Sequence, residues 1–209
     1  MIFFGHIGIT AGVTKACEVC LSLSKSGSLQ EQVSRSGTPV HTSNVQFRLS
    51  SLLYKLRNQL GRIDYRMVIF GSILPDIIDK PIFLLFGDSI TLSGRDYAHT
   101  LLINLSLLVI GLILLKYKKS WMLVLSLSSM LHLLLDRIWE CPEVLFWPVL
   151  GPLPGRATAG WVSDRWYSIF TVPEAYLPEI IGLVIVAAFL YRLIRKKQVI
   201  RFIRYGIVD

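Results

Sequence analysis

Histidine and aspartate residues recur at the ends of the most apolar stretches of this 209-residue sequence. Three of the four histidines, His6, His99 and His132, lie at such positions, and only His41 lies in a polar stretch. His132 and Asp136 are four residues apart on a predicted helix, so both side chains project from one face and can approach one ion together. Because ionisable groups inside an apolar run are costly when nothing binds them, this spacing predicts an ion-binding pair.

The acidic residues near these histidines favour a cation as the bound ion. Asp76, Asp79 and Asp136 have only Lys80 and Arg137 as nearby positive charges in the sequence. Imidazole and carboxylate ligands together suit zinc, and also manganese or iron, whereas calcium requires oxygen ligands. A metal with an open coordination position lowers the pKa of a bound water to about 7 and so supplies hydroxide for hydrolysis.

Each of these residues, taken alone, also has a simpler structural explanation. Asp76 follows Pro75 and can cap a half-helix, while Asp79 beside Lys80 can form a local ion pair. A single histidine within a membrane, such as His132, often only forms a hydrogen bond with a neighbouring helix. The convergence of several such residues on one membrane face favours the metal site over these separate explanations.

The elements that position these residues are expected to lie in a membrane. Hydrophobic residues make up 53% of the sequence, charged residues only 17%, and the mean hydropathy is +0.54. The net charge of +8 gathers in three blocks, at residues 25–66, 116–119 and 192–204. This is typical of cytoplasmic loops beside an anionic membrane, so lipid is the expected partner and nucleic acid is not.

Three stretches have the length and apolar character of membrane-spanning helices. Residues 97–117 are clearest, because 21 residues at about 1.5 Å each match a hydrocarbon core of roughly 30 Å. Residues 121–138 follow after a short basic turn, which predicts an antiparallel hairpin, and residues 177–194 form the third stretch. If the basic blocks are cytoplasmic, then His99, His132 and Asp136 lie toward the non-cytoplasmic face.

Two further apolar stretches, residues 1–23 and 67–86, are weaker candidates. The first carries ionisable residues, and the second is expected to be broken at Pro75 to Pro81, because each proline removes a backbone donor. The sequence therefore predicts an all-α, polytopic membrane bundle of about four to five apolar helices. Residues 1–209 form one predicted domain, in which the polar and basic stretch at about 24–66 is a flexible cytoplasmic loop.

Four motifs give the chain a resemblance to a known family: GHIGIT (5–10), ILPDIID (73–79), GRDYAHT (94–100) and LHLLLDRIWECPEVLFWPV (131–149). Together they resemble the membrane-bound metal-dependent hydrolases of the LexA-binding, inner-membrane-associated type. Their order is also distantly similar to that of the ligands in zinc-dependent phospholipase C. The sequence departs from the family in two places, since Gly94 stands where a histidine is usual and PDID becomes PDIID.

The resemblance implies a set of metal ligands and an activity. The implied ligands are His6, Asp76, His99, His132 and Asp136, with Asp79 as a further ligand or an orienting residue. The expected activity is hydrolysis of a phosphoester or another ester, lipid-like in character, with Asp79 or Asp136 accepting the proton from the metal-activated water. The expected location is a bacterial or archaeal cytoplasmic membrane, with the site toward the non-cytoplasmic face.

Two other functions are compatible with the same sequence. The first alternative is a catalytically inactive membrane scaffold or regulatory protein with a structural metal, which acts through its basic cytoplasmic surface. The glycine at position 94 favours this alternative. The second is a transporter that uses intramembrane acids as an ion path, but the acids cluster at one side and do not line a route across the membrane.

Overall fold

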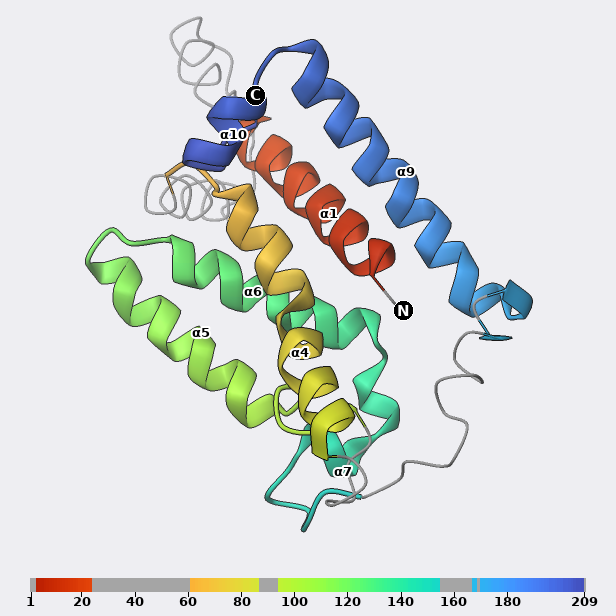
Figure 1. The fold of residues 1–209 in the computed structure, drawn as a ribbon. Coiled ribbons are helices and arrows are strands. Elements are labelled where there is room, and N and C mark those ends of the chain that lie inside the picture. The colour runs from red at the N-terminus through yellow and green to blue at the C-terminus, as the bar shows by residue number, and fades with distance from the viewer. Residues whose placement is uncertain (1–2, 24–60, 87–93, 155–166, 169, 209) are drawn as a thin grey trace, which may run out of the picture.

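The computed structural model describes residues 3–23, 61–86, 94–154, 167–168 and 170–208, and over these ranges the chain is helical with no strand (Figure 1). The long helices are α1 (Phe4–Leu23), α4 (Tyr65–Phe86), α5 (Leu101–Lys116), α6 (Trp121–Leu135) and α9 (Pro173–Arg195). The shorter ones are η2 (Ile138–Glu140), α7 (Pro142–Leu145) and α10 (Val199–Tyr205). The all-α prediction is confirmed for this part of the chain, while most of the predicted loop at 24–66 lies outside it.

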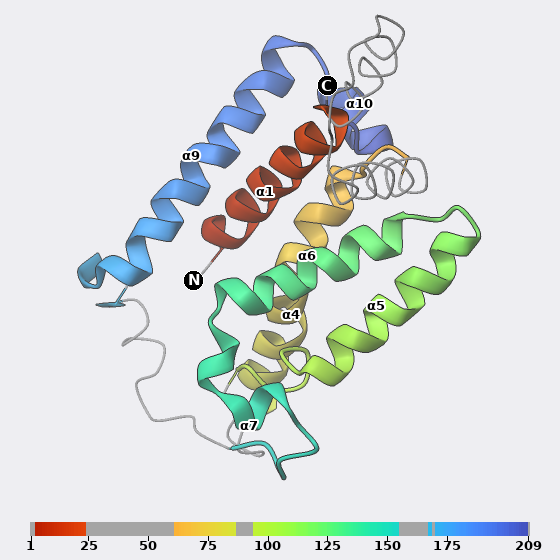
Figure 2. The ribbon, with the colours of Figure 1, turned by 180° about the vertical axis from the view of Figure 1, so that it is seen from behind.

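The long helices pack in an order that differs from their order in the sequence. Helix α1 contacts α9 on one side and α4 on the other, and α6 packs against both α4 and α5. Figures 1 and 2 show α9 beside α1 at one edge of the molecule and α5 at the opposite edge, with α4 and α6 between them. The first and last long helices of the chain are therefore neighbours, and α1 reaches the centre of the bundle.

Glycines lie where the helices approach most closely. A side chain at Gly8 of α1 or at Gly182 of α9 would overlap the main chain of the other helix. Gly71 of α4 faces the main chain of α6 in the same way, and Gly111 of α5 faces Leu123 of α6. Small residues at such contacts are typical of membrane helices, where close packing replaces the hydrophobic effect as the force between helices.

The predicted break at Pro75 to Pro81 is wrong. Helix α4 runs without a break from Tyr65 to Phe86, with both prolines inside it. The neighbouring helix α6 packs against α4 along the turn that precedes Pro75. The carbonyl of Ser72, in the turn before Pro75, accepts a hydrogen bond of 2.7 Å from Nδ1 of His132 in α6. The carbonyl that loses its helical donor to Pro75 is that of Gly71, so this contact supports the adjacent carbonyl and joins α4 to α6 where the helix continues through the proline.

Of the described helices, α9 alone is both long and apolar enough to cross a membrane by length and composition. Helices α5 and α6 are apolar but have only 16 and 15 residues, fewer than the predicted spans at 97–117 and 121–138. The Thr100 side chain caps the start of α5 by accepting a hydrogen bond from Ile103, and Arg137 adopts a left-handed conformation just after α6. His99, directly before Thr100, and Asp136, directly before Arg137, belong to the site described below.

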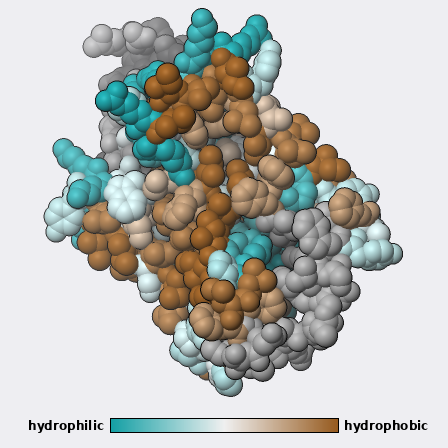
Figure 3. Space-filling model, in the orientation of Figure 1, coloured by the Kyte–Doolittle hydropathy of each residue, from teal (hydrophilic) through white to brown (hydrophobic). Residues whose placement is uncertain are grey.

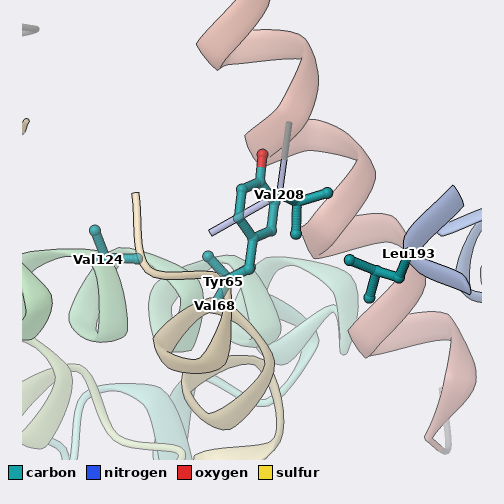
Figure 4. Close-up of a cluster of buried hydrophobic side chains, with 5 residues drawn as sticks. All are labelled: Tyr65, Val68, Val124, Leu193 and Val208. Carbon is teal, nitrogen blue, oxygen red and sulfur yellow. The ribbon is translucent and has the colours of Figure 1, made fainter. Parts of the chain in front are cut away.

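The surface also separates apolar from polar regions. Figure 3 shows apolar residues over much of one face, a large group of hydrophilic residues near α10 and the end of α9, and smaller hydrophilic groups elsewhere on the face. Beneath this polar end lies an apolar cluster that joins α4, α6, α9 and the C-terminal residues (Figure 4), formed by Tyr65, Val68, Val124, Leu193 and Val208. The Tyr65 hydroxyl donates a 2.9 Å hydrogen bond to Glu18 of α1, which holds α1 and α4 together at this end.

Candidate metal centre

Four side chains from three parts of the fold meet at one point between the helices. Asp76 comes from the middle of α4, His99 from the loop before α5, and His132 and Asp136 from the end of α6. One possible ligand atom from each lies within 4.8 Å of the others, and all four residues are buried. The structure therefore brings together four of the six residues predicted as metal ligands.

The distances between these atoms suit ligands around a single ion. Nε2 of His99 lies 3.3 Å from Nε2 of His132 and 3.7 Å from Oδ1 of Asp76. Nε2 of His132 lies 3.9 Å from the same Asp76 oxygen, and Oδ2 of Asp136 lies 3.9 Å from Nε2 of His99. Zinc bonds of about 2.0–2.1 Å in a tetrahedron put ligand atoms roughly 3.3 Å apart, so only small movements would complete such a site.

The hydrogen bonds behind the two histidines determine which nitrogen faces this point. Nδ1 of His99 lies 2.7 Å from Oδ2 of Asp79, and Nδ1 of His132 lies 2.7 Å from the carbonyl oxygen of Ser72. A carboxylate and a carbonyl only accept hydrogen bonds, so each Nδ1 carries a proton. The two Nε2 atoms then face each other, an arrangement that a metal ion or a shared proton between them stabilises.

Asp79 lies behind His99 and orients it. Its two oxygens accept hydrogen bonds from the backbone N–H groups of Asp96, Ala98 and His99 as well as from the His99 ring. Its side chain is fully buried, with no exposed surface. Of the two roles predicted for Asp79, ligand or orienting residue, this geometry favours the orienting role.

His6 lies at the edge of the cluster rather than among the four converging groups. Its Nε2 is 3.1 Å from Oδ1 of Asp136, and its ring stacks on that of His132 with 3.9 Å between the centroids. Within the described residues, Nδ1 of His6 and Oγ1 of Thr10 are buried without a hydrogen-bond partner. His6 therefore contacts two candidate ligands, Asp136 and His132, but it is not one of the four residues whose ligand atoms converge.

Helix α1 is held in place so that His6 can reach the site. Oε2 of Glu179, in α9, accepts hydrogen bonds from the backbone N–H groups of Phe3 and Gly5 at the start of α1. These groups have no partner within the helix, and a carboxylate is favourable at a helix N-terminus. Together with the close contact between Gly8 and Gly182, this cap fixes the first turns of α1 against α9.

Two positive side chains border the candidate ligands. Nζ of Lys80 lies 2.6 Å from Oδ2 of Asp76, and a guanidinium nitrogen of Arg95 lies 2.8 Å from Oδ2 of Asp136. The sequence suggested a local pair of Lys80 with Asp79, but the spacing of four residues puts Lys80 on the same helix face as Asp76. Arg95 was not among the site residues predicted from the sequence, although it lies within the GRDYAHT motif.

A buried polar network supports the loop that carries His99, and this network was not predicted from the sequence. The side-chain amide of Asn104 donates hydrogen bonds of 2.9 Å to the carbonyls of Ala98 and Thr100, and it accepts one of 2.7 Å from Ser129 of α6. The sequence indicates this network only through polar residues, Asn104 and Ser129 among them, inside the apolar stretches 97–117 and 121–138. Gly94, at the start of the same loop, has φ +76°, a conformation that glycine adopts more readily than other residues.

Comparison with known proteins places this site within a family. Residues 46–201 match the model of a family described as YdjM inner membrane protein, which is 156 of the 209 residues. The matched range includes Asp76, His99, His132 and Asp136, whereas His6 precedes it. No significant match was found to a curated protein or to a solved structure.

Proposed function

The chain belongs to the YdjM inner membrane protein family, and we propose that it is a membrane-embedded, metal-dependent hydrolase. The observation that carries this proposal is the pair of Nε2 atoms of His99 and His132, which face each other at 3.3 Å. Carboxylates of Asp76 and Asp136 surround the same point. Ionisable groups that gather at one buried point between apolar helices mark a candidate functional site.

The donor set fits a divalent transition metal. Two imidazole nitrogens and two carboxylate oxygens suit zinc first, with manganese or iron as alternatives. When bound, such a metal supplies a Lewis acid and lowers the pKa of a coordinated water to about 7. Asp79 and the Ser72 carbonyl keep His99 and His132 in the tautomer that presents Nε2 to the metal.

The same geometry favours different roles for Asp79 and Asp136, the two residues predicted to act as proton acceptors. Asp136 borders the point where the ligands converge, and its Oδ1 is held by a 3.1 Å contact with His6. Asp79 instead lies behind His99, with its oxygens directed at backbone amides and at the His99 ring, away from that point. We therefore assign proton transfer from the attacking water to Asp136 and a positioning role to Asp79.

The proposal also includes a membrane setting for the bundle. We propose that α1, α4, α5, α6 and α9 all span the membrane, with local thinning of the bilayer around the shorter α5 and α6. The end of α9 and α10 lie at one end of the molecule, with α7 toward the other (Figure 1). The basic residues of the first end favour a cytoplasmic location, which leaves Asp136 and α7 on the opposite face, open to a lipid-like ester.

The metal content of the purified protein tests this proposal. We would purify the full chain in detergent, measure bound metal by plasma mass spectrometry, and compare it with His132→Ala, Asp136→Ala and the control His41→Ala. We expect nearly one metal per chain in the parent and the control, and less than about a tenth of that in the other two variants. A parent protein without metal, at any zinc concentration tested, would contradict the proposal.

Activity then separates the enzyme from a scaffold with a structural metal. The metal-loaded parent would be assayed with soluble phosphodiesters, phospholipids and carboxylic esters. We expect hydrolysis that depends on the metal and is lost in Asp136→Ala. A fully metal-loaded protein that hydrolyses none of these esters would instead support the inactive scaffold or regulatory protein.

A further inference from the structure

Lys80 and Arg95 lie on the outward side of the candidate ligands. Their side chains are 39% and 29% exposed, whereas the side chains of Asp76 and Asp136, to which they are paired, are 10% and 2% exposed. Each positive group therefore lies between a buried carboxylate and the outside of the cluster. Any molecule that approaches the converging ligands from the exposed side meets these two groups.

Both positive groups are attached to the scaffold of the site. Lys80 is one helical turn beyond Asp76 on α4, so it keeps its position when α4 does. Arg95 lies in a loop whose next residue, Asp96, donates its backbone N–H to Oδ2 of Asp79 at 2.9 Å. The backbone N–H of Gly94 donates in turn to the Asp96 side chain at 2.9 Å. The carboxylate that orients His99 therefore also anchors the loop of Arg95.

Charge balance shows what a divalent metal would change. Two carboxylates, Asp76 and Asp136, are matched by two cations, Lys80 and Arg95, so the four groups are neutral together. A divalent ion adds two positive charges at the point that the carboxylates face. When the buried carboxylates Asp79 and Asp96 are included, the net charge of the metal and the six side chains is zero. Both of these carboxylates, however, accept hydrogen bonds from backbone amides away from that point. The exposed side of a loaded site is therefore positive.

We propose that Arg95 and Lys80 are the anion-binding residues of this site and that they select a phosphate-type ester over an uncharged carboxylic ester. This inference rests on the proposed function, because a metal bound by Oδ2 of Asp136 would compete with Arg95 for that oxygen. Lys80 contacts Oδ2 of Asp76, which leaves Oδ1 for the metal. The guanidinium of Arg95 matches two oxygens of a phosphate, and the ammonium of Lys80 supplies a second point charge. A carboxylic ester has no anionic oxygen for either group to bind.

A purely structural role for the two ion pairs makes a different prediction. If Lys80 and Arg95 only neutralise buried carboxylates, their removal weakens the fold and leaves the affinity of the loaded protein for anions unchanged. If they bind the substrate, their removal weakens anion binding while the metal is retained. Metal retention is expected because an unpaired carboxylate attracts a cation more strongly.

Binding of inorganic phosphate to the zinc-loaded full chain in detergent provides the test. We would measure the phosphate Kd by titration calorimetry for the parent, Lys80→Gln, Arg95→Gln and Arg95→Lys, with Arg137→Gln as control. Arg137 pairs with Glu140 on an exposed surface, so its loss should leave phosphate binding unchanged. We expect the Kd to rise at least about tenfold in each glutamine variant and less in Arg95→Lys. Bound zinc and thermal stability are measured on the same samples.

The outcomes distinguish this inference from the proposed function. Unchanged phosphate affinity in Lys80→Gln and Arg95→Gln, with zinc retained, overturns the anion-binding role and leaves the metal-dependent hydrolase intact. A parent chain that binds zinc but no phosphate overturns the inference in the same way. A parent chain that binds no metal overturns the proposed function and, with it, the inference.

Discussion

Oδ2 of Asp79 lies 2.7 Å from Nδ1 of His99, a residue that the chain reaches only after leaving α4 and crossing to the start of α5. The same carboxylate also accepts backbone hydrogen bonds from Asp96 and Ala98. Asp79 thus determines both the tautomer of a candidate ligand and the path of the loop that carries it. Such indirect contacts are expected to matter nearly as much as the ligands themselves.

Replacement of Asp79 by asparagine is therefore expected to weaken metal binding without unfolding the chain. The amide nitrogen of asparagine cannot accept a hydrogen bond, so some of the donors that now face the carboxylate lose their partner, and His99 loses its fixed orientation. We expect zinc affinity to fall about 10- to 100-fold, measured by competition with a chelator of known affinity.

The matched control for this variant is Glu143→Gln, the same chemical change at an exposed residue of α7. Its zinc affinity should equal that of the parent. If Asp79→Asn also bound zinc as tightly as the parent, the orienting role of Asp79 would be wrong. If it lost metal as completely as His132→Ala, Asp79 would be a ligand.

The polar residues of the site could be predicted because they are conspicuous in an apolar sequence. His132 and Asp136 are one helical turn apart, and the structure brings them to the same point as Asp76 and His99. The roles of Arg95 and Asn104 could not be predicted, because each depends on a contact with another element. Periodicity describes one helix at a time and does not say which helix lies opposite.

Helix boundaries and the effect of proline were harder to predict for the same reason. The break expected in α4 was based on the prolines alone, whereas α6 packs closely on this turn at Gly71 and His132 donates to the carbonyl of Ser72. The span predicted at 97–117 was too long at its start, because Thr100 caps α5 and the preceding residues turn toward Asp79. In both cases a partner distant in the sequence determined the local structure.

The contact between Gly8 and Gly182 is expected to control the stability of the bundle. Leucine at position 8 would overlap the main chain of α9, so α1 must move away and lose its packing. We expect Gly8→Leu to lower the free energy of unfolding by about 1–3 kcal/mol or more, measured by thermal unfolding in detergent. Gly12→Ala is the control, because the nearest atom is the tip of a flexible side chain, Ile185, at 3.3 Å. Equal stability of both variants would contradict the close packing of α1 on α9.

The proposed arrangement in the membrane predicts that the two ends of α6 lie on opposite sides. Lys119 is exposed in the basic turn before α6, and Glu143 is exposed in α7 shortly after α6. We would place single cysteines at these positions in a chain whose Cys17, Cys20 and Cys141 are replaced by serine. A thiol reagent that does not cross membranes should label Glu143→Cys in intact cells and Lys119→Cys only after the membrane is permeabilised. Labelling of both positions from the same side would show that α6 does not cross the membrane, and the reverse pattern would place the metal site on the cytoplasmic face.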